Sequence, residues 1–125
     1  MMSNPVLYSA DLIGCEELAC LAPGHLTATF VSALEHAGGT IVERVMHEFP
    51  GTGLTCVLVL RESHAVLHTW PELGTVNVDI FSCSSRLRGL DVIKDLEREF
   101  RARRVAIQQS PRAGGALPAA DSRDA

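Results

Sequence analysis

The densest run of chemically active side chains lies between residues 61 and 72. It reads Arg-Glu-Ser-His-Ala-Val-Leu-His-Thr-Trp-Pro-Glu, and it places a hydroxyl, two imidazoles, an indole and two carboxylates within twelve positions. The segments around it are apolar, and a polar side chain that is buried among them needs a hydrogen-bonding partner. A reaction that uses these groups would centre on Ser63, His64 or His68.

A metal site and a hydrolase are two kinds of chemistry that these residues could support. His64 and His68 share one face of a strand but stand about 13 Å apart at roughly 3.3 Å per residue, so they hold one ion only if the chain turns. A hydrolytic serine usually lies in a Gly-x-Ser-x-Gly turn. Here Glu62 and His64 flank Ser63 instead. We therefore expect neither a bound metal nor a serine hydrolase.

Self-cleavage is the third kind of chemistry. Ser63 would attack the carbonyl carbon of Glu62, which requires a tightly turned peptide bond, and a break between an apolar strand at 54–60 and an extended segment at 64–70 could provide one. After the acyl shift a base must remove the Ser63 Cα proton. His68 can serve because imidazole titrates near neutrality. Alternatively, Ser63 and both histidines are only hydrogen-bonded strand residues.

Hydrophobic periodicity predicts a small α+β fold around this run. Apolar residues at helical spacing predict helices at 25–37 and 90–100. The second helix carries an apolar stripe of Leu90, Ile93, Leu96 and Phe100. The segment 75–82 alternates as a strand does, with Val76, Val78 and Ile80 on one face and Asn77, Asp79, Phe81 and Cys83 on the other.

The order of the elements is taken as β-α-β-β-β-α-β. A mostly antiparallel sheet with two helices packed on one face fits this order. The other face of the sheet would be exposed and apolar unless a second chain covers it. We therefore expect a homodimer in which two such sheets meet, giving an α/β/β/α sandwich.

Length, composition and charge narrow the class of protein. The 125 residues predict one domain at 1–109, followed by a tail at 110–125 that has little to bury and is expected to be disordered. A net charge of −4 argues against nucleic-acid binding. No run is long and apolar enough to span a membrane, and the N-terminus does not resemble a signal peptide. We expect a cytoplasmic protein with reduced cysteines.

The active run resembles the processing site of a known family. Glu62-Ser-His64 followed by His68-Thr-Trp-Pro-Glu72 is similar to the signature of prokaryotic S-adenosylmethionine decarboxylase proenzymes. Further similarity lies in Asp11-Leu-Ile-Gly-Cys15, in His47-x-Phe49 before a glycine-rich turn, and in Val78-Asp-Ile-Phe-Ser-Cys83. The resemblance covers about residues 6–108.

The resemblance implies a self-processing enzyme. The chain would be cut between Glu62 and Ser63 into a β chain (1–62) and an α chain (63–125), and Ser63 would become a pyruvoyl group, the cofactor. His68 would be the base for processing. Cys83 would be the acid that reprotonates the product carbon, whereas the other cysteines, Cys15, Cys20 and Cys56, are expected to be buried apolar residues.

A pyruvoyl group also suits the composition. Its carbonyl condenses with the amine of a substrate and accepts the electrons left when CO₂ departs, as pyridoxal phosphate would. Pyridoxal phosphate needs a lysine, and the only one in the chain, Lys94, lies in the second expected helix, far along the sequence from the active run. An electrophile made from Ser63 removes that need.

The substrate stays open between S-adenosylmethionine and a basic amino acid. Adenine and a sulfonium favour aromatic surfaces and carboxylates, which Phe49, Trp70 and Glu72 could supply. Ornithine or arginine would instead need Glu72 or Asp79 at the far end of the pocket. The sequence Ala65-Val66, where the family usually has Leu-Ser, keeps the amino-acid decarboxylase under consideration, and a non-enzymatic binding relative is the third alternative. The first reading predicts an enzyme that makes the aminopropyl donor for spermidine.

Overall fold

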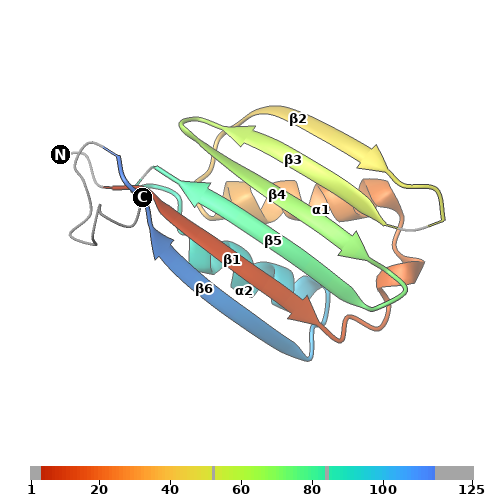
Figure 1. Cartoon of the computed structure of the whole chain (residues 1–125). Helices are drawn as coiled ribbons and strands as arrows, with labels where there is room; N and C mark the ends of the chain where they lie inside the picture. The colour runs from red at the N-terminus through yellow and green to blue at the C-terminus, as the bar shows by residue number, and fades with distance from the viewer. Residues whose placement is uncertain (1–3, 52, 84, 115–125) are drawn as a thin grey trace, which may run out of the picture.

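The computed structural model describes residues 4–51, 53–83 and 85–114, which form one sheet and two α-helices (Figure 1). The elements in chain order are β1 (Val6–Ile13), the short 3-10 helix η1 (Leu18–Cys20), α1 (Pro23–His36), β2 (Ile41–Glu48), β3 (Leu54–Leu60), β4 (Ser63–Trp70), β5 (Thr75–Ser82), α2 (Gly89–Glu99) and β6 (Arg104–Pro111). Neighbouring strands are antiparallel, and their order across the sheet is β2-β3-β4-β5-β1-β6. The strand that begins with Ser63 therefore lies inside the sheet.

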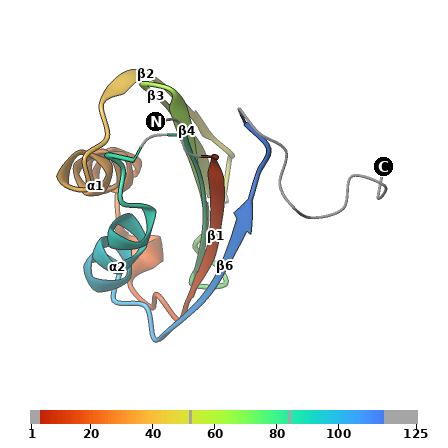
Figure 2. The same ribbon diagram turned by 90° about the vertical axis from the view of Figure 1, so that its left-hand side faces the viewer.

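Both α-helices pack on the same face of the sheet (Figure 2). This arrangement confirms the predicted α+β class with a mostly antiparallel sheet. The expected order β-α-β-β-β-α-β is wrong in one respect, because four strands and not three separate the helices. The apolar strand at 54–60 and the extended segment at 64–70 are both full strands, β3 and β4, joined by a tight turn, so the predicted order has one strand too few.

The last strand is longer than expected. β6 continues through Ser110 and Pro111, which pair with Leu7 and Val6 of β1. The backbone N–H of Arg112 then donates to the carbonyl oxygen of Pro5 at 2.9 Å. The predicted start of the disordered tail at residue 110 is therefore too early. The backbone groups of Ser110 and Pro111 pair with β1 instead. Residues 115–125 of that tail lie outside the described residues.

The core lies between the sheet and the helices. Alternate side chains of the strands face it, among them Ala65, Leu67, Val76, Val78 and Ile80, and the helices contribute Phe30, Leu34, Val92, Ile93 and Leu96. Full burial of one such aliphatic or aromatic side chain contributes about 1.5–3 kcal/mol. Leu90 was expected in this stripe but is 37% exposed. Positions 89, 92, 93 and 96 share the buried face of α2, which turns position 90 away from it.

The second face of the sheet, called the open face from here on, carries the other half of the strand side chains. On it lie His64, Val66, His68 and Trp70 of β4, with Thr55, Val57 and Val59 of β3 and Thr75, Asn77, Asp79 and Phe81 of β5 beside them. Large apolar side chains are exposed here, including Val59 and Trp70. The predicted division of β5 into an apolar and a polar face is confirmed.

Candidate active site

Ser63 is placed by a two-residue hairpin turn. Leu60 of β3 pairs with Ser63 of β4, so that Arg61 and Glu62 alone form the turn. The backbone N–H of Arg61 donates to the carbonyl oxygen of Thr40 at 3.0 Å. Glu62 has a φ of 65°, a left-handed conformation that costs a residue with a Cβ roughly 1–2 kcal/mol. The peptide bond before Ser63 thus follows a strained residue in an exposed turn.

Ser63 and Cys83 lie together at one end of the sheet. The Ser63 side chain is on the helix-covered face and only 9% exposed. Its Oγ accepts a hydrogen bond from the backbone N–H of Cys83 at 3.1 Å. Cys83 directly follows β5, and its thiol is half-buried. Two residues that the sequence assigned to one reaction, twenty positions apart, are therefore neighbours in the folded chain.

His68 lies on the other side of the sheet. It is five positions from Ser63, which is about 16 Å along a strand, and the odd spacing turns the two side chains to opposite faces. On the open face His68 Nδ1 is 2.8 Å from Oγ1 of Thr55, its partner in the β3–β4 register. His68 therefore does not contact Ser63 of its own chain.

The expected substrate-binding residues lie mostly at the end of the sheet away from Ser63. Trp70 ends β4 and is 45% exposed, and Glu72 is exposed in the turn that follows. Phe49 is 47% exposed and lies edge-on to His47 with 4.6 Å between the ring centroids. Asp79 is exposed halfway along β5, opposite Val66.

The loop after β2 brings Phe49 toward the Trp70 end of the sheet. The backbone N–H of Phe49 donates to the carbonyl oxygen of Gly53 at 2.9 Å. Gly53 packs so closely on β4 that a Cβ there would overlap the carbonyl oxygen of Thr69. Glycine is thus required at position 53, and it holds the Phe49 loop against β4.

Two hydrogen bonds at the Trp70 end of the open face were not foreseen from the sequence. The indole N–H of Trp70 donates to Oδ1 of Asn77 at 2.6 Å, and Nδ2 of Asn77 donates to Oδ1 of Asp11 at 2.7 Å. Asp11 was noted only as part of a motif. The periodicity of residues 75–82 put Asn77 on the polar face, but it carried no signal that β1 would lie beside β5.

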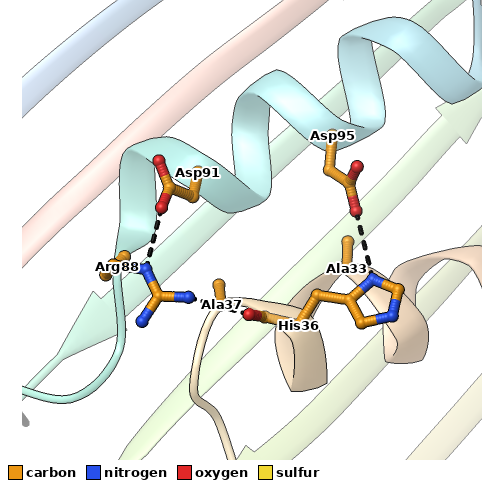
Figure 3. Close-up of a pocket in the computed structure, with 6 residues that line it drawn as sticks. All are labelled: Ala33, His36, Ala37, Arg88, Asp91 and Asp95. Atoms are coloured by element: carbon orange, nitrogen blue, oxygen red, sulfur yellow. Dashed lines mark hydrogen bonds and ion pairs between the residues drawn. The ribbon is translucent and has the colours of Figure 1, made fainter.

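A pocket of about 150 Å³ lies elsewhere, in the helical layer. Ala33, His36, Ala37, Arg88, Asp91 and Asp95 line it (Figure 3). The Arg88 guanidinium donates to the carbonyl oxygen of His36 at 2.8 Å and contacts the Asp91 carboxylate at 2.8 Å, so it caps the end of α1 and ties it to α2. None of the predicted site residues lines this pocket.

The histidines of the active run make separate contacts. His64 stacks on Phe81, with 5.3 Å between the ring centroids, while His68 contacts Thr55. Within residues 4–51, 53–83 and 85–114, no group of three or more histidine, cysteine or acidic side chains is placed to hold a metal ion. Over the same residues, no helix has the length and hydrophobicity needed to cross a membrane.

Comparison with known proteins places the chain in a family. A family model described as S-adenosylmethionine decarboxylase matches residues 7–113. The S-adenosylmethionine decarboxylase proenzyme of Moorella thermoacetica is 41% identical over 93 residues, or 74% of each chain. That of Pelotomaculum thermopropionicum is 32% identical over 109 residues, which cover 87% of this chain and 85% of the relative. That of Methanococcus maripaludis is 32% identical over 102 residues, covering 82% and 84%.

A solved structure shares the fold. The crystal structure of the adenosylmethionine decarboxylase from Aquifex aeolicus matches with a TM-score of 0.78 and 20% identity over 98% of both chains. The protein is therefore an α+β protein of this fold, with a serine at a strained hairpin. The chain belongs to the S-adenosylmethionine decarboxylase family, which confirms the resemblance seen in its motifs.

The cysteines differ in environment. Burial raises the pKa of the Cys15 and Cys56 thiols, and for Cys56 a hydrogen bond with Thr27 and the charge of Arg44 oppose the shift. Cys20, which was expected to be buried, is exposed because η1 lies at the surface.

We predict that a maleimide labels Cys20 of the native protein quickly at neutral pH, whereas Cys15 and Cys56 react only on unfolding, as measured by peptide mass spectrometry. Because folding raises the pKa of the two buried thiols, their protonated state stabilises the fold below the unfolded thiol pKa of about 8.5. That contribution is lost as the pH rises through the folded value. If Cys15 is labelled as fast as Cys20, the Cys15 thiol is not buried in the native protein.

Proposed function

We propose that this protein is a self-processing decarboxylase that removes CO₂ from S-adenosylmethionine, with a pyruvoyl group made from Ser63 as its cofactor. The observation that carries the proposal is the hairpin: Ser63 follows the strained Glu62, and its Oγ is held by the Cys83 amide. Family membership supports the same substrate. The product would be the aminopropyl donor for spermidine synthesis.

The processing step follows from the residues at the turn. The Ser63 hydroxyl attacks the carbonyl carbon of Glu62, and the peptide C–N bond is replaced by an ester. A base then removes the Cα proton of Ser63, and the ester leaves as the carboxylate of Glu62. Water hydrolyses the remaining imine, ammonia leaves, and the new N-terminus is a pyruvoyl group.

The hairpin fits such a group. Ser63 is the first residue of β4, so a cut before it removes a covalent bond in an exposed turn and leaves β4 paired with β3 on one side and β5 on the other. The group supplies an electrophilic carbonyl that condenses with the substrate amine and withdraws the electron pair left when CO₂ departs. The Cys83 thiol would be the acid that returns a proton to the product carbon, and the contact of the Cys83 backbone N–H with Ser63 Oγ supports a place for this residue at the same end of the sheet.

A second chain completes the site in this proposal. His68 faces the open face, about 16 Å along the strand from its own Ser63. The open face also exposes apolar side chains, and contiguous apolar surface of this kind marks an interaction site. We infer a homodimer in which two open faces meet as an α/β/β/α sandwich.

The symmetry of that dimer decides which ends meet. A twofold axis that lies between the sheets and runs across the strands reverses the strand direction of one copy relative to the other. The Trp70 end of one open face then lies over the Ser63 end of its partner. The partner subunit's His68 would then lie over the Ser63 end of β4 and could act as the base at the Ser63 Cα, a backbone atom of the sheet, and the partner subunit's Phe49 and Glu72 would complete the substrate pocket. An axis along the strands would instead superpose equal ends and leave His68 out of reach.

S-adenosylmethionine is favoured over a basic amino acid by the aromatic side chains. Phe49 and Trp70 are each nearly half exposed at the same end of the sheet, so both present aromatic surface that an adenine could contact. Ornithine and arginine have no flat group that would use this surface. They would rely on Glu72 and Asp79, which lie at different heights along the strands.

The proposal predicts two fragments and one preferred substrate. Intact-mass analysis of the purified protein should give residues 1–62 and an α chain that starts with a pyruvoyl group at position 63. The processed protein should release CO₂ from S-adenosylmethionine and not from ornithine or arginine. The Ser63→Ala variant should stay as one chain and be inactive. A full-length wild-type chain that still decarboxylates would contradict the mechanism.

If the backbone strain at Glu62 promotes cleavage, relieving it should slow processing. Glycine adopts a φ of 65° without cost, so Glu62→Gly removes roughly 1–2 kcal/mol of strain and should slow cleavage about five- to thirty-fold if that strain favours the acyl shift. Glu62→Ala removes the same carboxylate but keeps the strain, and it should cleave near the wild-type rate. The rates are read by gel electrophoresis of freshly synthesised precursor. Equal rates for the two variants would show that the strain does not contribute.

A further inference from the structure

Three side chains on neighbouring strands form a hydrogen-bonded chain across the open face. Trp70 of β4 donates to Asn77 of β5 at 2.6 Å, and Asn77 donates to Asp11 of β1 at 2.7 Å. These strands are adjacent in the sheet (Figure 1). The set is called the Trp70–Asn77–Asp11 chain below.

The chemistry of the end groups fixes the direction of every bond. An indole N–H can only donate, and an ionised carboxylate can only accept. An asparagine between them satisfies both in one of its two amide orientations, with Oδ1 toward Trp70 and Nδ2 toward Asp11. The Asp11 carboxylate therefore selects the orientation of Asn77, and Asn77 then holds the indole N–H.

The Trp70–Asn77–Asp11 chain lies next to His68, a residue of the proposed site. Asn77 lies directly opposite His68 in the β4–β5 register, and Trp70 is the next residue of β4 on the same face. Trp70 is 45% exposed, so packing on its own leaves much of the ring free to turn. The hydrogen bond that the indole donates to Asn77 Oδ1 then restrains the plane of the ring.

We propose that Asp11 and Asn77 are positioning residues that hold the Trp70 indole as a flat surface for the adenosyl part of the substrate. Neither residue touches the reacting atoms, so both act on substrate affinity and not on bond cleavage. Only the identity of the substrate rests on the proposed function. The ordering of the indole by Asp11 is a property of the unliganded protein.

The experiment uses the fact that Trp70 is the only tryptophan in the chain. Intrinsic fluorescence therefore reports on this indole alone. Asn77→Asp places a second carboxylate beside Asp11 with no donor between them, so charge repulsion displaces the position-77 side chain that accepts the indole N–H. The emission should shift to longer wavelength, acrylamide quenching should increase and anisotropy should fall. The KM for S-adenosylmethionine should rise at least about fivefold, as expected when a base loses an aromatic stacking surface, while kcat changes less than about twofold.

A charge exchange provides the rescue. In the double variant D11N/N77D the amide at position 11 donates to the carboxylate at position 77, which accepts from the indole. The net charge equals that of the wild type. The fluorescence and the KM should return toward wild-type values. The matched control is Glu35→Gln, which removes a carboxylate at an exposed position of α1, outside the Trp70–Asn77–Asp11 chain and away from the open face, and it should change neither readout.

Each outcome tests a different part of the proposal. Unchanged fluorescence in Asn77→Asp, or no recovery in the double variant, overturns the positioning role. Altered fluorescence with an unchanged KM overturns the role in substrate affinity. A wild-type protein that does not decarboxylate S-adenosylmethionine overturns the proposed function and the substrate, while the fluorescence still tests the chain. If Asn77→Asp fails to fold, Asp11→Ala removes the acceptor at an exposed position and provides the same comparison.

Discussion

The alternation of side chains along β4 is the constraint on which the account depends. A strand turns successive side chains to opposite faces and extends about 3.3 Å per residue. Ser63 therefore faces the helices with Ala65 and Leu67, while His68 faces the open side. No change of rotamer brings the imidazole around the sheet to the serine of the same chain. Within one chain, Ser63 and the proposed base His68 are separated both across the sheet and along β4. The proposed dimer removes the separation along the strand.

The hairpin at Ser63 combines a labile bond with a rigid surrounding. Strain is confined to Glu62, in an exposed turn, while the strand that follows is paired on both sides. Cutting the turn therefore releases local strain without removing a strand from the sheet. The Cys83 amide holds Ser63 Oγ from the neighbouring strand, so the residue proposed as the acid is next to the residue proposed to become the electrophile. In the proposed mechanism, processing and turnover use the same end of the sheet.

Much of the site could be predicted from the sequence because its residues are local. The run from 61 to 72 predicted the residues that the structure places at the β3–β4 hairpin and along β4, and the alternation of 75–82 assigned each side chain of β5 to the correct face. The distance between Ser63 and His68 could also be estimated from strand geometry, but not the identity of the neighbouring strands. Asp11 and Asn77 are 66 positions apart, and only the pairing of β1 with β5 brings them together.

The predictions from sequence that proved wrong also failed because of how distant parts of the chain are arranged. Cys20 looks apolar by type, but the short 3-10 helix that carries it lies at the surface. Ser110 and Pro111 have the composition of a tail, yet the edge of β1 offers them backbone partners. Local composition predicts the structure that a residue prefers on its own. The structure of these residues depends instead on where the rest of the fold places them.

The most direct test of the shared site is a mixed dimer of two inactive chains. One chain carries Ser63→Ala and keeps His68; the other carries His68→Ala and keeps Ser63. The two are co-expressed with different tags and the mixed species is isolated. If the partner subunit's His68 serves Ser63, the second chain is cut between residues 62 and 63 in the mixed dimer, although it stays whole when expressed alone. An isolated mixed dimer whose second chain remains at full length would contradict the account.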